Sequence, residues 1–232
     1  MHLRTSRRRL TPVALAAGLI GSAILGFGAT GTFSALTATV TNTNDTAGTG
    51  TIVMQETDGN STQTGSCRSD SGSGNSTTCA AFNKYGGSTS LLPGSGTSTS
   101  TIRIFNVGTL PARQFTITPL TCSVPAANNP AGTTGNICDY LTLTLTCTVT
   151  SAGSSAAAVQ VYDGTKSAAS LSKIAANGAL DLRTAKACTP PPGPAGGNSY
   201  TTFNFSVALD SSAGNDIQGQ TATQQIQWQF TA

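Results

Sequence analysis

Apolar and polar residues alternate with a period of two along much of the chain. The clearest run covers residues 141–150, where the odd positions are Leu, Cys or Val and every even position is Thr. Such alternation gives a strand one buried face and one solvated face. The pattern recurs over 203–209 and 226–230, and further strands are predicted over 49–56, 98–107, 112–118 and 157–162. Many short strands separated by Gly, Pro and Asn predict an all-β, antiparallel β-sandwich.

Few segments depart from this pattern. Residues 167–176 predict a helix, so we expect at most one short helix in the fold. Asp163-Gly164 predicts a hairpin turn after the strand at 157–162. Long loops are predicted at 58–78, 126–136 and 189–198, which are rich in Ser, Gly, Asn or Pro.

The first 31 residues have the three parts of a secretory signal peptide. A basic region (Arg4–Arg9) precedes an apolar run (Val13–Phe27), and Ala29-Thr-Gly31 places small residues before a cleavage site between Gly31 and Thr32. The apolar run is shorter than the roughly 20 residues of a spanning helix, which disfavours a membrane anchor. The arginines leave both general and twin-arginine export open. We therefore expect a signal peptide at 1–31, an N-terminal segment at 32–48 and one sandwich domain at 49–232.

Removing the signal peptide changes the charge of the chain. The whole chain carries 12 Lys and Arg, 9 Asp and Glu and a net charge of +3, but residues 32–232 hold eight cations and nine anions. A nucleic-acid binder needs clustered cations, so this class is disfavoured. His2, the single histidine, is also lost, which removes His-based catalysis and His-ligated zinc. The chain has few charged residues but 39 Thr and 25 Ser, and this composition favours a β-sheet with an uncharged polar surface.

The cysteines predict disulfides. All six follow the signal peptide, their number is even and none forms a CxxC pair, as expected for an exported protein. Six cysteines allow 15 pairings. We expect the sequential one because the first two pairs bracket predicted loops: Cys67–Cys79, Cys122–Cys138 and Cys147–Cys188.

Catalytic and metal-binding motifs are missing from the sequence. It contains no HExxH, no phosphate-binding glycine loop, no GxSxG and no Cys/His pair, and no two acids are marked as a glycosidase pair. Residues 70–75 have the oxygen-rich composition of a calcium loop but too few carboxylates, so a solvated loop is favoured. We expect no enzyme, no cofactor and no metal site.

Three stretches together resemble the TasA/camelysin family of secreted bacterial proteins. The first is Gly31-Thr-Phe-Ser-Ala35 followed by Asn44-Asp-Thr-Ala-Gly-Thr49. The second is Leu91-Leu-Pro-Gly94 followed by Asn106-Val-Gly-Thr-Leu-Pro-Ala112, and the third is Ala213-Gly-Asn-Asp-Ile-Gln-Gly-Gln-Thr-Ala222. The cysteines and long loops depart from the short members of that family, so contacts with partners are expected to differ.

The resemblance implies a jelly-roll-like β-sandwich, here with long disulfide-stapled loops, that serves as a subunit of extracellular biofilm-matrix fibres. It also implies cleavage by a SipW-type signal peptidase and an N-terminal segment that pairs with the sheet of a neighbouring subunit. The residues agree: after Phe33, an extended stretch places Leu36, Ala38 and Val40 on one face and threonines on the other. Such a strand can complete an open sheet edge in a head-to-tail polymer. The alternative is that residues 33–41 form the first strand of their own sheet.

Two other functional classes stay open. The chain could be a monomeric binding module or adhesin for cell-surface or matrix components, acting through its long loops, although four Tyr and one Trp offer few stacking platforms for sugars. A secreted hydrolase is the third reading. The metalloprotease label of some camelysin relatives receives no support, since the chain beyond the signal peptide has no histidine.

Overall fold

The computed structural model describes residues 49–60, 65–193 and 197–232. Contacts divide the chain into residues 1–48, which lie outside the described part, and a compact unit spanning Thr49–Ala232. The predicted signal peptide and the N-terminal segment thus both lie outside the described residues. Within the described part, no helix has the length and apolar character needed to cross a membrane.

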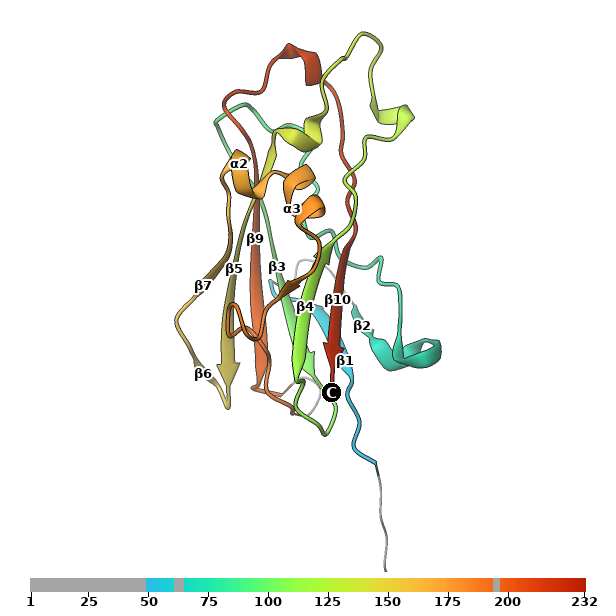
Figure 1. Cartoon of the computed structure of the whole chain (residues 1–232), viewed down its shortest axis with the longest axis vertical. Coiled ribbons are helices and arrows are strands. Elements are labelled where there is room, and N and C mark those ends of the chain that lie inside the picture. The colour runs from blue at the N-terminus through green and yellow to red at the C-terminus, as the bar shows by residue number, and fades with distance from the viewer. Residues whose placement is uncertain (1–48, 61–64, 194–196) are drawn as a thin grey trace, which may run out of the picture. The chain divides into compact units, whose positions relative to one another are not determined.

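The larger of two antiparallel sheets contains the strands with the strongest alternation. Its strand order is β2-β1-β3-β9-β5, and both β6 and β7 pair with the far edge of β5. The strands are β1 (Met54–Asp58), β2 (Ser66–Arg68), β3 (Ser98–Asn106), β5 (Leu141–Ser151), β6 (Ser154–Ser155), β7 (Val159–Asp163) and β9 (Tyr200–Leu209) (Figure 1).

The second sheet is smaller and has the order β10-β4-β8. Its strands are β4 (Gln114–Pro119), β8 (Leu180–Asp181) and β10 (Ile226–Thr231). Two short helices lie between β7 and β8: α2 (Lys166–Ala169) and α3 (Leu171–Asn177). Single turns of 3-10 helix occur in the loops: η2 (Ser69–Ser71), η3 (Ser73–Asn75), η4 (Ala126–Asn128), η5 (Ile137–Asp139) and η6 (Asn215–Ile217).

The core lies between the facing sides of the two sheets. In the large sheet, β5 and β9 align their apolar residues, with Leu143 opposite Val207 and Leu145 opposite Phe205. Phe115 of β4 meets Phe203 of β9 edge-on, with 5.9 Å between the ring centroids. These side chains are almost fully buried, and each contributes roughly 1.5–3 kcal/mol relative to an exposed position. The all-β, antiparallel sandwich class predicted from the alternation is therefore present.

Several local predictions need correction. The predicted single helix is two helices, because Ser170 adopts an extended conformation (φ −62°, ψ 150°) between them. Asp163-Gly164 leads from β7 into α2, so it is not a hairpin turn. The predicted loop at 58–78 contains β2, and the strand predicted from residue 49 begins at Met54.

Three disulfides link Cys67 to Cys79, Cys122 to Cys138 and Cys147 to Cys188, which is the sequential pairing. The first two close the long loops. The third joins the centre of β5 in the large sheet to the segment that follows β8 in the small sheet.

Candidate functional site

Strand β10 has one edge that no other described strand pairs with. It is the terminal strand of its sheet and bonds only to β4 within the described part of the chain. The carbonyls of Gln225 and Thr231 accept hydrogen bonds from residues flanking β4. Because backbone groups alternate between the two sides of a strand, those of Ile226, Trp228 and Phe230 point to the opposite, unpaired edge.

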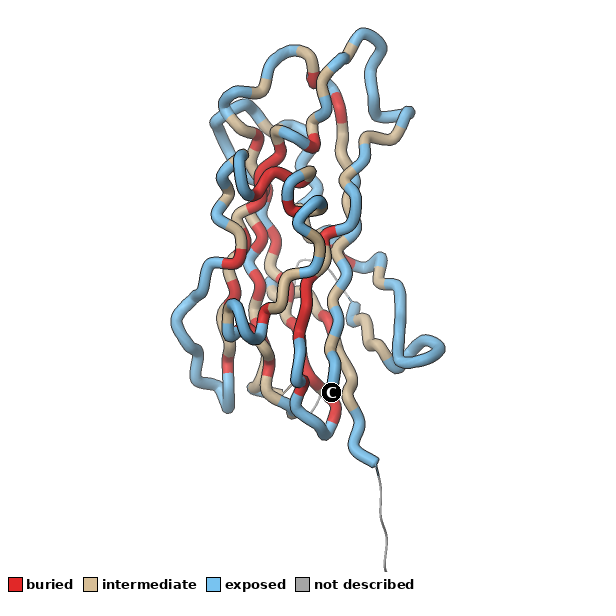
Figure 2. The backbone as a smooth tube through the Cα atoms, in the orientation of Figure 1, coloured by how far each residue is buried: buried red, intermediate tan, exposed pale blue. Residues whose placement is uncertain are grey.

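The inner face of β10 is incompletely covered. Burial alternates between half-buried and exposed along β10, and no residue in it is fully buried. In β9, by contrast, every second residue is buried, and Figure 2 shows this difference between the two strands. The half-buried residues of β10 are its three large apolar ones, Ile226, Trp228 and Phe230. In a closed sandwich, such a row would be covered by a further strand.

A groove runs along this open edge. It has a volume of about 1530 Å³ and lies between β10 on one side and β1 with the segment 82–93 on the other. Its apolar lining comes from all of these elements and from the end of β9: Met54, Phe82, Leu91, Val207, Leu209, Ile226, Trp228 and Phe230. Small-molecule sites usually measure about 300–1,000 Å³, so the groove is larger than a small ligand needs. A long groove lined by apolar and polar side chains, beside a strand edge that no other described strand pairs with, suits an extended peptide.

Aromatic contacts hold Trp228 in the wall of the groove. Its ring stacks on Phe115 at 5.7 Å between centroids and lies against Phe203 at 4.7 Å. The chain contains one tryptophan, so its fluorescence reports on this groove alone.

The opposite wall of the groove contains a buried ion pair. Lys84 Nζ lies 2.7 Å from Glu56 Oε1, and the two side chains are only 11% and 8% exposed. Burial of both charges in an apolar wall demands that they remain paired.

A hydrogen bond joins the two walls at the end of the groove near Ile226. The Tyr85 hydroxyl donates to Gln224 Oε1. Gln224 is itself held by its amide, which donates to the carbonyls of Leu120 (2.7 Å) and Leu171 (3.0 Å). Burial raises the pKa of Tyr85 well above its ordinary value of 10.

We expect the protein to lose stability as the pH rises above 10. In the unfolded chain tyrosines ionise near pH 10, whereas burial raises the pKa of Tyr85 and lifts that of Tyr162 to about 12. Between these values the folded state binds more protons than the unfolded state, so the free energy of unfolding falls as the pH rises. This contribution is constant only below about pH 9, where the tyrosines are protonated in both states. Urea midpoints at pH 8 to 11.5 measure this slope. Tyr85→Phe should flatten it, and an unchanged slope in this variant would contradict the assignment.

The predicted assembly and cleavage residues lie outside the described part: Gly31, Thr32, Phe33, Leu36, Ala38 and Val40. The open edge of β10 was missed by sequence reasoning. The alternation over 226–230 tells which side chains of that strand share a face, but a period of two does not tell which strand lacks a neighbour.

Three acidic residues, Asp70, Asp181 and Asp210, serve local structure. Asp70, in the loop considered for calcium, is paired with Arg68 through two contacts of 2.9 and 2.8 Å. Hydrogen bonds from the hydroxyls of Thr184 and Ser212 lower the pKa of Asp181 and Asp210. Across the residues that the structure describes, no group of three His, Cys, Asp or Glu side chains is placed to hold a metal ion.

The chain matches no protein-family model, and it matches no curated protein. The geometry of the groove therefore carries the functional argument.

Proposed function

We propose that this chain is a secreted structural protein whose copies assemble into extracellular filaments of the biofilm-matrix type. The edge of β10 that no other described strand pairs with, beside a groove that contains a row of large apolar side chains, carries this proposal. An open edge invites pairing with another strand, and proteins that remain monomeric usually cover such an edge.

The N-terminal segment has the pattern that the groove requires. Leu36, Ala38 and Val40 alternate with threonines, so an extended segment directs these three side chains to one side. Pairing with the outward backbone groups of β10 would supply hydrogen bonds, while the apolar residues fill the groove. The same residues would be exposed if the segment stayed free in water.

Assembly outside the cell fits the rest of the chain. A signal peptidase acting between Gly31 and Thr32 would release the N-terminal segment, and three disulfides are typical of an oxidising compartment. The residues that resemble the TasA/camelysin family support the same conclusion. Other matrix or cell-surface components are further candidates for contact with the uncharged surface.

A segment that enters the groove of the next copy makes a heterologous contact. Each copy then donates one strand and accepts one, so the polymer grows without closing. A segment that entered its own groove would give a monomer, and the two arrangements compete for one site.

Deleting residues 32–42 from the mature protein is expected to abolish filaments. The deletion removes the strand that fills the groove and leaves the acceptor intact. Negative-stain electron microscopy of the purified wild-type and deletion proteins checks this result. Filaments that persist in the deletion variant would overturn strand exchange.

Two substituted proteins and a peptide sharpen this test. Leu36→Asn with Val40→Asn should prevent filaments, whereas Thr37→Asn with Thr39→Asn, on the other side of the strand, should preserve them. A synthetic peptide of residues 32–42 should bind the deletion protein and change the fluorescence of Trp228. A wild-type protein that stays monomeric favours the adhesin or binding-module reading.

A further inference from the structure

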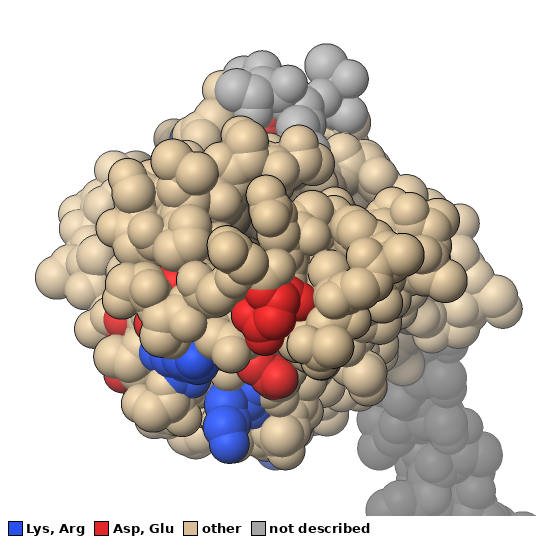
Figure 3. All heavy atoms as spheres, turned by 90° about the horizontal axis from the view of Figure 1, so that it is seen from above, with Lys and Arg blue, Asp and Glu red and all other residues tan. Residues whose placement is uncertain are grey.

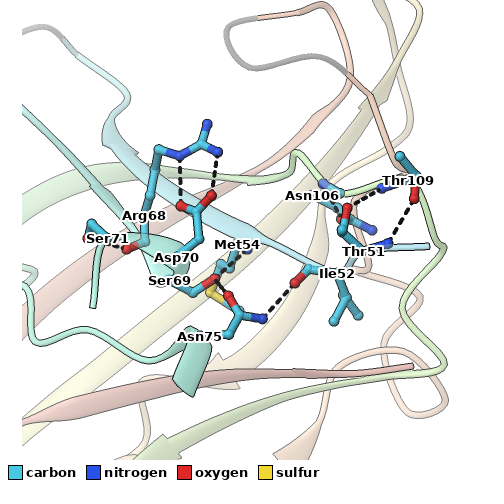
Figure 4. Close-up of polar contacts among 11 residues, drawn as sticks. Thr51, Ile52, Met54, Arg68, Ser69, Asp70, Ser71, Asn75, Asn106 and Thr109 are labelled. Carbon is cyan, nitrogen blue, oxygen red and sulfur yellow. Dashed lines mark hydrogen bonds and ion pairs between the residues drawn. The ribbon is translucent and has the colours of Figure 1, made fainter. Parts of the chain in front are cut away.

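The N-terminal segment leaves the sandwich from a clamped position. The backbone at Thr51 bonds to the loop after β3: its carbonyl accepts from the amides of Thr109 and Leu110, both at 2.9 Å. The backbone amide of Thr51 also donates to the Thr109 hydroxyl at 2.9 Å, and the amide of Thr109 donates to the Thr51 hydroxyl at 3.3 Å (Figure 4). Gly108 allows this approach, because a Cβ there would lie 2.4 Å from the Thr51 carbonyl oxygen.

The other side of the same stretch is held by the loop that the Cys67–Cys79 disulfide closes. The amide of Asn75 donates to the carbonyl of Ile52 at 2.7 Å, and the Ser69 hydroxyl accepts from the backbone of Met54 at 3.0 Å. Residues 51–54 are therefore fixed from both sides, and so is the point from which the segment departs.

Strand pairing places this point at one end of the sandwich. Met54, the first residue of β1, lies opposite Asn106, the last residue of β3. At the same end, the carbonyl of Thr231, the last residue of β10, accepts a hydrogen bond from the amide of Arg113, which lies just before β4. We call this the lower end, as in Figure 1. The upper end contains the start of β5 and the loops 120–140 and 210–225.

The direction of insertion follows from this placement. Strand β10 runs from the upper to the lower end. A segment from a copy stacked above would enter the groove from the upper end, on the solvent side of the Tyr85–Gln224 hydrogen bond that joins the walls there. Its N-terminus would point down, and it would run antiparallel to β10. A segment that folded directly back into its own groove would run parallel to β10, and parallel pairing is the less stable per residue.

The charges of the two ends are complementary. Around the lower end lie three cations and one anion: Arg113, Arg183, Lys186 and Asp181. Around the upper end lie four anions and two cations: Asp139, Asp163, Asp210, Asp216, Lys166 and Lys173. The net charge of these groups is therefore about +2 at the lower end and about −2 at the upper end. Two of the other cations form ion pairs within the chain, Lys84 with Glu56 and Arg68 with Asp70. Figure 3 looks onto the upper end and shows charged atoms gathered on one side of an otherwise uncharged surface.

We infer that the lower end of one copy docks on the upper end of the next, guided by these charges, so that every donated strand enters from above and pairs antiparallel with β10. This inference rests on the proposed filament function. Charges at the rim of a contact act chiefly on the rate of association and on orientation, so the expected effect concerns growth rate.

Charge reversal of each end tests the inference. The lower-end variant is Arg113→Glu with Lys186→Glu, and the upper-end variant is Asp139→Lys with Asp216→Lys. At low ionic strength, each of these two variants should elongate wild-type seeds or its own seeds roughly tenfold more slowly than the wild-type protein elongates wild-type seeds. A chain that carries all four substitutions has reversed but complementary ends, so it should elongate its own seeds at close to the wild-type rate. Light scattering of seeded growth gives the rates, and circular dichroism confirms that each variant is folded.

High salt provides the matched control. At about 1 M salt the screening length is about 3 Å, so all folded variants should elongate at similar rates. Two results would overturn the docking inference while leaving strand exchange intact. In the first, the variants reversed at one end elongate as fast as the wild type at low salt. In the second, the variant with all four substitutions elongates no faster than the variants reversed at one end. A wild-type chain that forms no filaments overturns both.

Discussion

Replacing Cys147 and Cys188 together by alanine is expected to lower the free energy of unfolding by about 4 kcal/mol. The two residues are 41 positions apart, the widest separation of the three pairs, so the bond removes the most freedom from the unfolded chain. Both residues are almost fully buried, at 1% and 0% exposure. The bond ties the centre of β5 to the segment after β8, and Thr201 donates a buried hydrogen bond of 2.7 Å to the Cys188 carbonyl.

Urea unfolding followed by Trp228 fluorescence measures this loss. The matched control is Cys67→Ala with Cys79→Ala, which opens a loop of 12-residue separation at half-buried positions and should cost about 3 kcal/mol or less. A Cys147/Cys188 variant within about 1 kcal/mol of the wild type would show that the two sheets hold together without the bond.

The strands were predictable wherever one face is buried and the other is wet. In β5, Leu143 and Leu145 are buried while Thr144 and Thr146 are only half-buried, so periodicity alone indicated the element. Strands of two or three residues, β2, β6 and β8, carry no such period and were missed. Alternation also tells which face of a strand is buried but not which strands are neighbours, and for that reason the free edge of β10 needed the structure.

The polar features of the groove were beyond sequence reasoning for a different reason. Glu56 and Lys84 are separated by 28 positions, and charged residues are ordinarily exposed. Only the pairing of β1 within the sheet brings Glu56 to the wall where the segment 82–93 supplies Lys84. Tyr85 and Gln224, which are still further apart in the chain, meet in the same way.

Removing one partner of the Lys84–Glu56 pair is expected to destabilise the fold by about 3–5 kcal/mol. Lys84→Met would leave the Glu56 carboxylate buried without its cation, and within the described residues no hydrogen bond to the Glu56 Oε1 atom compensates for the loss. Glu56→Leu would leave the Lys84 ammonium buried in the same wall without its anion. Each single variant should therefore unfold at a clearly lower urea concentration than the wild type.

The double variant Glu56→Leu with Lys84→Met should recover most of that loss, because apolar residues of similar volume replace a buried pair at little net cost. A double-mutant cycle in urea gives the coupling between the two residues as the difference between the double loss and the summed single losses. Arg68→Met is the control at the exposed pair with Asp70, whose side chains are 38% and 41% exposed, and it should leave the urea midpoint close to that of the wild type. Losses that simply add in the Glu56/Lys84 double variant would mean that the two charges do not depend on each other, and that water reaches this wall of the groove.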